Sequence, residues 1–245
     1  MSQELRCLFC QQRDAKISVE HILSASIRRH IGGTDYTATI YRQPKGGRLE
    51  QRGEFETPTP TFTRRIYCEL CNNGWMQEMD VAAEPVLGPL IHGEDARLSL
   101  DDQKQLATWS WKVALVCESL AGASRQVPDD EFHRFFLDRR PPPGEPIDLM
   151  HYTGGTIRHE YARREITQTA DVEVPRAHAV LITVIIEQFV MQTSVPVTGL
   201  ARRAIINADD RVVIWPSTIQ GVRWPPPIGF DDDRLRMLTT QDWPN

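Results

Sequence analysis

The sequence predicts an α+β protein made of a small zinc-stapled module followed by a domain of helices and antiparallel strands. Three observations point to this class: two Cys-x-x-Cys pairs in the first third of the chain, two helix-like segments in its middle, and runs of β-branched and aromatic residues after position 147. We expect the module at residues 1–82, a connection at 83–98 and an α+β accessory domain at 99–245.

The module is expected to be held together by zinc. Cys7 and Cys10 form one pair and Cys68 and Cys71 the other, so together they offer the four thiolates of a closed tetrahedral site. Cysteines at this spacing favour metal over disulfides in a reducing compartment. This part of the chain has few large aliphatic residues and needs such a staple, and the long interval between the pairs must hold structure of its own. The fifth cysteine, Cys117, lies in an apolar run and is expected in the core.

Residues 82–98 mix proline, glycine and short apolar pieces, which is typical of a connection between units. A helix is expected to begin directly after this stretch, because Ser99 followed by Asp102 resembles a capping box. The run to about Leu120 is rich in Leu, Ala, Trp and Val, so this helix should be largely buried.

A second, shorter helix is predicted over residues 128–140. Pro128 suits its first position, and acidic residues follow near its N-terminus. Arg139 and Arg140 lie near its C-terminus, where the helix dipole favours positive charge. The run of prolines that comes next is expected to end the helix.

Beyond residue 147 the strand-like runs predict a mainly antiparallel sheet packed against the two helices. The three prolines at 225–227 must lie in irregular structure. The longest apolar run, residues 179–191, is interrupted by Glu187 and Gln188 and falls short of the roughly 20 residues that cross a bilayer. We therefore expect no membrane span, and because the N-terminus lacks a secretion signal, we expect a cytoplasmic protein.

The formal net charge of −5 argues against a globally basic nucleic-acid binder, but the charge is unevenly distributed. Between His21 and Arg65 there are eight Lys or Arg residues and four acidic ones, a local net charge of +4. This basic segment lies in the interval between the two cysteine pairs. It suits a polyanionic partner such as nucleic acid.

Glu20 and His21 lie side by side at the start of the basic segment. A carboxylate can hold a hard divalent cation, and a neutral imidazole can remove a proton from water near pH 7, so the pair offers a division of catalytic labour. In a regular strand adjacent side chains point to opposite faces, whereas on a loop or a bulge they can converge on one ligand. A lone Glu-His pair is most often a surface accident, but this one lies between two cysteine pairs.

The order of these residues, with Cys-x-x-Cys, then Glu-His, then Cys-x-x-Cys-Asn, resembles the HNH nuclease family, the zinc-stapled ββα-metal class that includes the endonuclease VII-like enzymes. The resemblance covers about residues 5–80, a third of the chain. It implies a structural zinc ion, His21 as the general base, and Glu20 and Asn72 as ligands of a catalytic Mg²⁺ or Mn²⁺ ion. The expected reaction is hydrolysis of phosphodiester bonds in nucleic acid, with DNA favoured over RNA.

The sequence departs from the family pattern at two positions. Many members carry an Asn about five residues before the second cysteine pair, which orients the catalytic His, but here Thr63 stands near that position. The orienting role is left open among Thr63, Thr61 and a backbone carbonyl. The proline that commonly follows the His is replaced by Ser24. Asn73 competes with Asn72 for the second ligand position, and Asn72 is favoured because it directly follows the cysteine.

Four arginines of the basic segment are the candidate substrate contacts. Their guanidinium groups would bind phosphate oxygens, and the alternative is that each is a solvated surface charge. They are Arg28, Arg29, Arg64 and Arg65.

Three functional hypotheses follow. The first is a metal-dependent HNH endonuclease whose accessory domain sets target choice, regulation or assembly, through a homo-oligomer or a partner protein. The second is a degenerate zinc-stabilised module that binds nucleic acid or protein without cutting it. The third makes the C-terminal two thirds the main function, with the nuclease as effector of a bacterial or phage defence or mobile-element system. The joint presence of Glu20, His21 and Asn72 favours the first, because a binding module needs none of them there.

Overall fold

The computed structural model describes residues 6–32, 36–42, 50–57, 63–155, 159–168, 177–198, 209–217 and 221–239. Its helices are α1 (Ala25–Arg28), α2 (Glu69–Cys71), η1 (Asn72–Met76), α3 (Gln77–Ile91), α4 (Leu100–Ser119), η2 (Gly122–Ser124), α5 (Asp129–Asp138) and α6 (Asp232–Thr239). Its strands are β1 (Ile17–His21), β2 (Tyr36–Arg42), β3 (Glu50–Thr57), β4 (Thr63–Cys68), β5 (Ala96–Leu98), β6 (Ile147–His151), β7 (His159–Gln168), β8 (Ala177–Ile186), β9 (Phe189–Thr198), β10 (Val212–Trp215) and β11 (Val222–Trp224). These elements confirm the α+β class.

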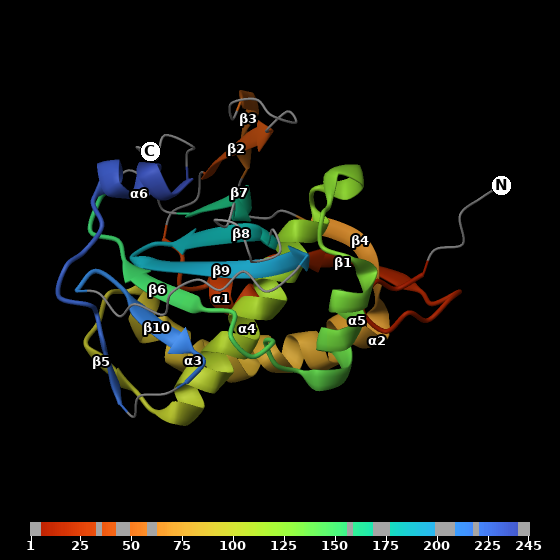
Figure 1. Cartoon of the computed structure of the whole chain (residues 1–245), viewed down its shortest axis with the longest axis horizontal. Coiled ribbons are helices and arrows are strands. Elements are labelled where there is room, and N and C mark those ends of the chain that lie inside the picture. The colour runs from red at the N-terminus through yellow and green to blue at the C-terminus, as the bar shows by residue number, and fades with distance from the viewer. Residues whose placement is uncertain are drawn as a thin grey trace.

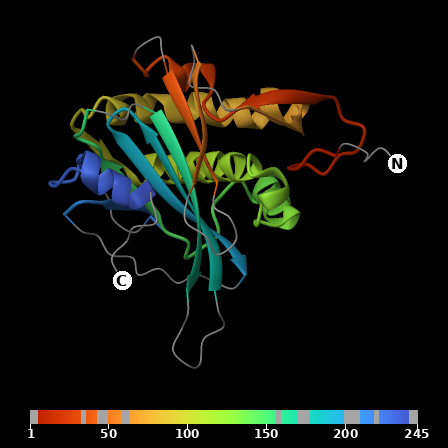
Figure 2. The same ribbon diagram turned by 90° about the horizontal axis from the view of Figure 1, so that it is seen from above.

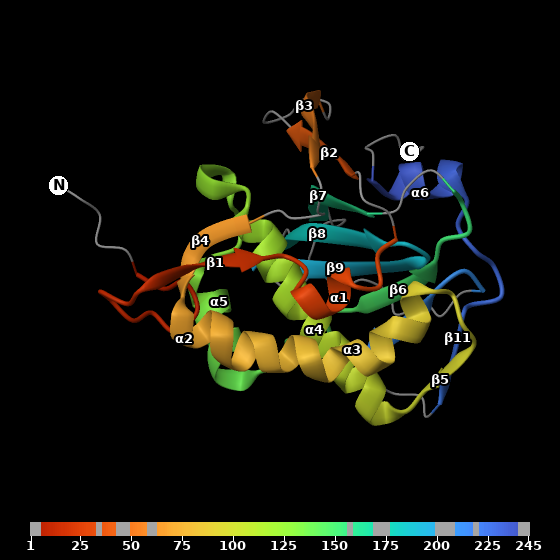
Figure 3. The same ribbon diagram turned by 180° about the vertical axis from the view of Figure 1, so that it is seen from behind.

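Among the described strands, five form an antiparallel sheet in the order β10-β6-β9-β8-β7. Helix α4 packs along one face of this sheet, and α3 lies on the other side of α4 together with β1 and β4 (Figures 1 and 3). The view from above shows α4 between α3 and the sheet (Figure 2). This middle position explains why 14 of the 20 residues of α4 are buried, because a helix covered on both sides must be apolar around most of its surface.

Two antiparallel strands and a helix make up the part of the chain around the cysteines. β1 pairs with β4, and the ladder ends with His21 opposite Thr63. The register breaks between Ser18 and Glu20, which is a local bulge directly before the candidate catalytic residues. The helical segments α2, η1 and α3 follow β4 without a loop.

The interval between the two cysteine pairs holds structure of its own, as its length predicts. Besides β1 and α1 it contains β2 and β3, which pair antiparallel with each other. This pair lies near β7 and extends away from the five-stranded sheet (Figure 1).

Both predicted helices are present. The Ser99 hydroxyl accepts a hydrogen bond from the Asp102 N–H at 3.1 Å, and the Asp102 carboxylate accepts one from the Ser99 N–H at 2.8 Å, so the capping box is complete. α4 ends at Ser119, close to the predicted end. α5 begins one residue later than predicted, with Pro128 at the N-cap, and ends at Arg139, whose φ of 52° is left-handed.

The first half of residues 83–98, which the sequence predicts as a connection between units, is helical, because α3 continues to Ile91 through two prolines. Its buried residues Ala83, Leu87 and Leu90 recur at helical spacing along one face. Their burial against α4 outweighs the backbone hydrogen bonds that the prolines cannot make. The second half contains β5, which pairs with β11.

The long apolar run at residues 179–191 folds back on itself. Glu187 and Gln188 form a two-residue turn between β8 and β9, and Glu187 adopts a left-handed φ of 52°. Ile186 therefore pairs with Phe189 across the turn, and the run supplies the two central strands of the sheet rather than one.

One cluster of buried residues draws on all three predicted ranges. It contains Cys7 and Phe9 from the module, Leu87 from the predicted connection, and Trp109 and Ile182 from the accessory range. The packing is therefore continuous, and the division into domains stays a prediction. Among the described helices, none combines the length and the apolar character that crossing a membrane requires.

Candidate metal and catalytic site

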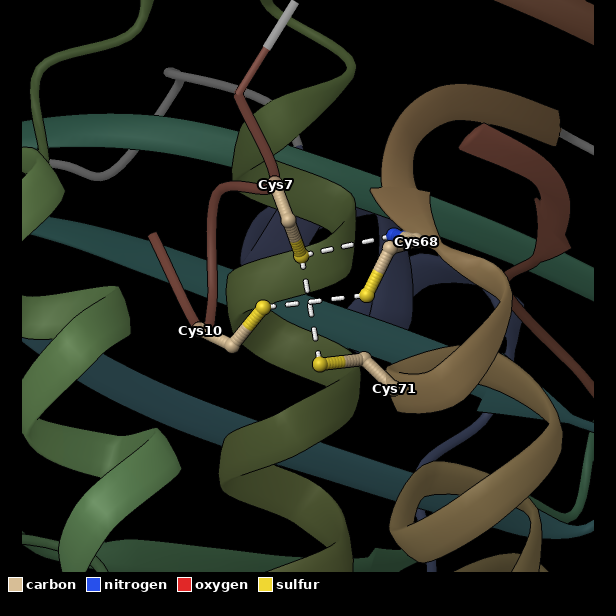
Figure 4. Close-up of side chains that lie close together, drawn as sticks. All are labelled: Cys7, Cys10, Cys68 and Cys71. Atoms are coloured by element: carbon tan, nitrogen blue, oxygen red, sulfur yellow. Dashed lines mark hydrogen bonds between the residues drawn. The ribbon is translucent and has the colours of Figure 1, made fainter. Parts of the chain in front are cut away.

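The first cysteine pair lies in a tight turn. The Cys7 N–H donates to the Gln12 carbonyl at 3.1 Å, and the Gln11 N–H donates to the Cys7 carbonyl at 3.0 Å. Gln11, which follows Cys10, has a left-handed φ of 63°, so the chain reverses directly after the second cysteine. This reversal keeps the two thiols on the same side of the turn (Figure 4).

The second cysteine pair lies at the junction of β4 with the helix. Cys68 is the N-cap of α2 and Cys71 is its last residue, and both thiols face the first pair (Figure 4). The backbone N–H of Cys68 donates to the Cys7 sulfur at 3.3 Å. Hydrogen bonding between the Cys7 and Cys71 thiols, with help from this backbone bond, lowers the pKa of Cys7 below its ordinary value.

The four sulfur atoms fit a zinc ion. They all lie within 4.8 Å of one another, with Cys7 and Cys71 3.9 Å apart and Cys10 and Cys68 3.7 Å apart. Sulfur atoms at about 2.3 Å from a tetrahedral zinc ion are separated from one another by about 3.8 Å. The prediction that these four cysteines come together is therefore confirmed, and their spacing could hold a zinc ion.

Aromatic side chains next to the cysteines pack against one another and against α5. Phe9 stacks on Tyr67 with ring centroids 4.8 Å apart and meets Trp75 edge-on at 5.0 Å. Trp75 also meets Phe135 of α5 at 5.9 Å, and the Arg139 guanidinium lies 3.8 Å from the Trp75 ring centroid. Trp75 thus packs the start of the long helix against α5.

Glu20 is buried directly after the register shift between β1 and β4, where β4 carries the extra residue, and 5% of its surface is exposed. Burial raises the pKa of Glu20 to about 7, the Lys112 ammonium acts to lower it, and the Asp80 carboxylate raises it further. Lys112 forms its own ion pair with Asp80, and within the described part of the chain Glu20 makes no ion pair. A buried carboxylate without a contacting cation has the donor chemistry that a divalent metal ion requires.

His21 ends β1, and its cross-strand partner is Thr63. Burial lowers the pKa of His21 below its ordinary value of 6.5, and the nearby Arg28 guanidinium acts in the same direction. The Nδ1 atom of His21 is buried and has no hydrogen-bond partner among the described residues. Thr63 therefore does not orient the imidazole through a hydrogen bond to Nδ1. Thr61, the other threonine considered for the orienting role, lies outside the described residues.

Asn72 ties the start of the helix to β1. Its Nδ2 donates to the Ser18 hydroxyl at 2.8 Å and to the Val19 carbonyl at 2.9 Å. These bonds leave Oδ1 without a hydrogen bond to any described residue. Asn73, the competing candidate, is exposed. The structure therefore brings Asn72, and not its neighbour, next to the strand that carries Glu20.

The four candidate arginines differ in their surroundings. Arg28 and Arg64 are half-buried, and neither forms an ion pair with a described residue. Arg29 pairs with Glu84, with its Nη2 2.9 Å from a carboxylate oxygen. Arg65 is exposed. Arg28 and Arg64 are therefore the two that are half-buried and make no ion pair with a described residue.

Two buried charged residues that act on Glu20, Asp80 and Lys112, escaped the sequence analysis. The Asp80 Oδ1 accepts hydrogen bonds from Trp109 Nε1 at 2.8 Å and from Lys112 Nζ at 2.6 Å. Lys112 is fully buried and Asp80 is 4% exposed. The sequence does contain one signal for this ion pair, which is a lysine within the apolar run of a helix expected to be buried. Such a lysine needs a buried acidic residue as its partner.

No protein-family model, no curated protein and no solved structure matches the chain. Among the described residues, the four cysteines form the sole group of three or more metal-binding side chains that lie close together. A function must therefore be argued from the residues and their geometry.

Proposed function

We propose that the protein is a metal-dependent endonuclease of the HNH type that hydrolyses phosphodiester bonds of nucleic acid, with DNA favoured over RNA. The observation that carries this proposal is the hydrogen bond from Asn72 to Val19, which fixes the helix start directly beside Glu20 and His21. Cys71 immediately precedes Asn72, so the cysteine site anchors the same junction. Two antiparallel strands followed by a helix are also the order that the family resemblance implies.

His21 has the properties of a general base. Its lowered pKa keeps the imidazole neutral at pH 7, and the burial of Nδ1 leaves Nε2 as the nitrogen that can take a proton from water. That water attacks the phosphorus atom in line with the 3′-oxygen, whose bond to phosphorus then breaks. General-base help of this kind accelerates a reaction by about 10²- to 10⁴-fold.

Glu20 and Asn72 are the proposed ligands of a divalent cation. A carboxylate and an amide oxygen are hard donors of the type that Mg²⁺ and Mn²⁺ accept, and Mg²⁺ rarely needs more than one or two protein ligands besides substrate phosphates. When bound, such a cation neutralises charge on the scissile phosphate and on the leaving 3′-oxygen. The hydrogen bonds of the Asn72 nitrogen to β1 leave its Oδ1 as the atom for this role.

Arg28 and Arg64 are the leading candidates for contacts with phosphate oxygens, because they are half-buried and no acidic side chain in the described part of the chain neutralises them. Arg64 is the cross-strand partner of Glu20, which puts its backbone beside the proposed reaction centre. Arg29 and Arg65 are proposed as weaker, outer contacts. Arg29 would first have to give up its ion pair with Glu84.

Incubation of the purified, zinc-loaded protein with supercoiled plasmid DNA and with RNA tests the proposal. The reactions contain Mg²⁺, Mn²⁺ or EDTA. We expect nicked or linear plasmid with either metal and none with EDTA. Intact DNA and intact RNA in both metals would favour a zinc-stabilised binding module instead.

A further inference from the structure

We propose that Asp80 forms, together with Glu20, a pair of carboxylates that binds a divalent cation, that Trp109 orients Asp80 for this role, and that Lys112 balances the negative charge of the pair while the cation is absent. The claim that this cation is the catalytic one rests on the proposed nuclease function. The cation site itself can be tested without any cleavage reaction.

The hydrogen bonds of Asp80 orient its carboxylate. Trp109 Nε1 and Lys112 Nζ both donate to Oδ1, at 2.8 Å and 2.6 Å. The other oxygen, Oδ2, makes no hydrogen bond to a described residue. An outer-shell donor such as the Trp109 indole fixes a metal-binding carboxylate in one orientation. The Lys112 ammonium supplies the positive charge that a bound cation would replace.

Asp80 and Glu20 come from different elements that pack together. Asp80 lies in α3, Glu20 near the end of β1, and α3 passes beneath β1 and α1 when the molecule is seen from behind (Figure 3). The Asp80 carboxylate is near enough to Glu20 to raise the pKa of Glu20. Lys112 is the cation that acts on both of them.

The buried group of Glu20, Asp80 and Lys112 has two carboxylates and one ammonium group. Glu20 is more than nine-tenths buried and makes no ion pair with a described residue, whereas Lys112 is committed to Asp80. Two carboxylates therefore share one ammonium group. A divalent cation between Glu20 and the free oxygen of Asp80 would supply the missing positive charge.

Stability alone does not account for these residues. Removing charged groups from water is costly, and well-packed apolar residues of the same volume usually stabilise a core as well or better. The position of Lys112 in α4 also means that the site extends from the predicted module into the predicted accessory range.

A titration of the zinc-loaded chain with Mn²⁺ tests the inference. Electron paramagnetic resonance measures how much Mn²⁺ stays free. We expect one Mn²⁺ per chain in addition to zinc. Asp80→Asn and Glu20→Gln should each weaken this binding by at least about 10-fold. Glu78→Gln, an exposed carboxylate two residues earlier in α3, is the matched control and should bind like wild type. Wild-type affinity in Asp80→Asn would overturn the inference.

Lys112→Met separates a metal site from a merely structural ion pair. It removes the ammonium group that competes for the two carboxylates, so we expect several-fold tighter Mn²⁺ binding. Unchanged or weaker binding in a folded Lys112→Met variant would contradict the proposed site. Because Asp80→Asn leaves Lys112 buried without a partner, Asp80→Asn/Lys112→Met serves as the second variant if the single one does not fold, and it should also lose Mn²⁺ affinity.

The outcomes also separate this inference from the proposed function. Mn²⁺ binding that depends on Asp80, in a protein that cuts neither DNA nor RNA, would overturn the nuclease function and leave the cation site in place. Metal-dependent cleavage with unchanged Mn²⁺ binding in Asp80→Asn would overturn the role of Asp80 and leave the nuclease function standing.

Discussion

The side-chain amide of Asn72 donates a hydrogen bond to the Val19 carbonyl at 2.9 Å. Val19 lies directly before Glu20, at the register shift where β4 carries one extra residue. The contact therefore joins the first residue after the cysteine site to the strand that carries the candidate catalytic residues. It makes the geometry of the proposed site depend on the start of one helix.

We expect Asn72→Ala to lower the free energy of unfolding by about 1–3 kcal/mol, because it leaves the Val19 carbonyl without its donor. Asn72→Asp should cost more, since a carboxylate has no proton to donate and would face the carbonyl oxygen. Urea denaturation of the zinc-loaded protein measures both. Asn73→Ala, at the exposed neighbour, should stay within about 0.5 kcal/mol of wild type. Equal stability of Asn72→Ala and Asn73→Ala would contradict this role of Asn72.

Removal of one zinc ligand should unfold the region around β1, β4 and α2. A structural zinc site contributes on the order of 10 kcal/mol to such a fold, so Cys68→Ser should lose both its zinc and its native structure. Zinc content by mass spectrometry and circular dichroism measure the two effects. Cys117→Ala, at a fully buried cysteine outside the metal site, should keep one zinc per chain. A Cys68→Ser variant with full zinc and a native spectrum would argue against the metal site.

The arginines should differ in their contribution to nucleic-acid binding. Each phosphate contact changes the slope of log affinity against log salt by about 0.9 for duplex DNA. Arg28→Gln and Arg64→Gln should therefore each weaken binding and reduce this slope by about one contact. Arg29→Gln should have a smaller effect, because Arg29 is paired with Glu84. Fluorescence anisotropy in EDTA over a salt series measures these slopes without cleavage, and identical slopes for all variants would exclude the assignment.

Glu145 predicts a pH-dependent loss of stability. The residue is fully buried, neither carboxylate oxygen has a partner among the described residues, and burial raises its pKa to about 7, with a further push from Glu131. As pH rises from about 4.5 to about 7, the unfolded chain releases this proton while the folded protein retains it, so stability falls across that window. Above about pH 7 the folded protein carries a buried negative charge at Glu145, and the loss of stability stays constant.

Glu145→Gln removes this cost. We expect the variant to be more stable than wild type by on the order of 1–3 kcal/mol at pH 8 and to differ little at pH 5. Urea denaturation at the two pH values gives the difference, and Glu94→Gln, at an exposed glutamate, should show no such pH dependence. The same stability difference at pH 5 and pH 8 would show that Glu145 does not titrate in this way.

Features that depend on neighbours in the chain were predictable from the sequence. The capping box needs only Ser99 and Asp102, three residues apart, and the two cysteine pairs need only their spacing. The course of α3 was not predictable in this way. Its prolines favour a connection locally, and only burial against α4 keeps the segment helical.

The same distinction applies to the candidate site. Glu20 and His21 are adjacent in the sequence, so their joint use could be proposed from it. The partners of Asp80 lie 29 and 32 residues away on α4, and only the packing of α3 on α4 brings them together. The bulge that precedes Glu20 depends on the register with β4, which the sequence does not specify.

The most direct test of the proposed nuclease compares plasmid cleavage by wild type and by His21→Ala, both zinc-loaded and both folded by circular dichroism. We predict that wild type cuts in Mg²⁺ or Mn²⁺ and that His21→Ala cuts about 10²- to 10⁴-fold more slowly while binding DNA with the same affinity. Wild-type cleavage should also decline as pH falls through the lowered pKa of His21, because the protonated imidazole cannot accept a proton. Equal cleavage rates for the two proteins would contradict the assignment of His21 as general base and with it the proposed reaction.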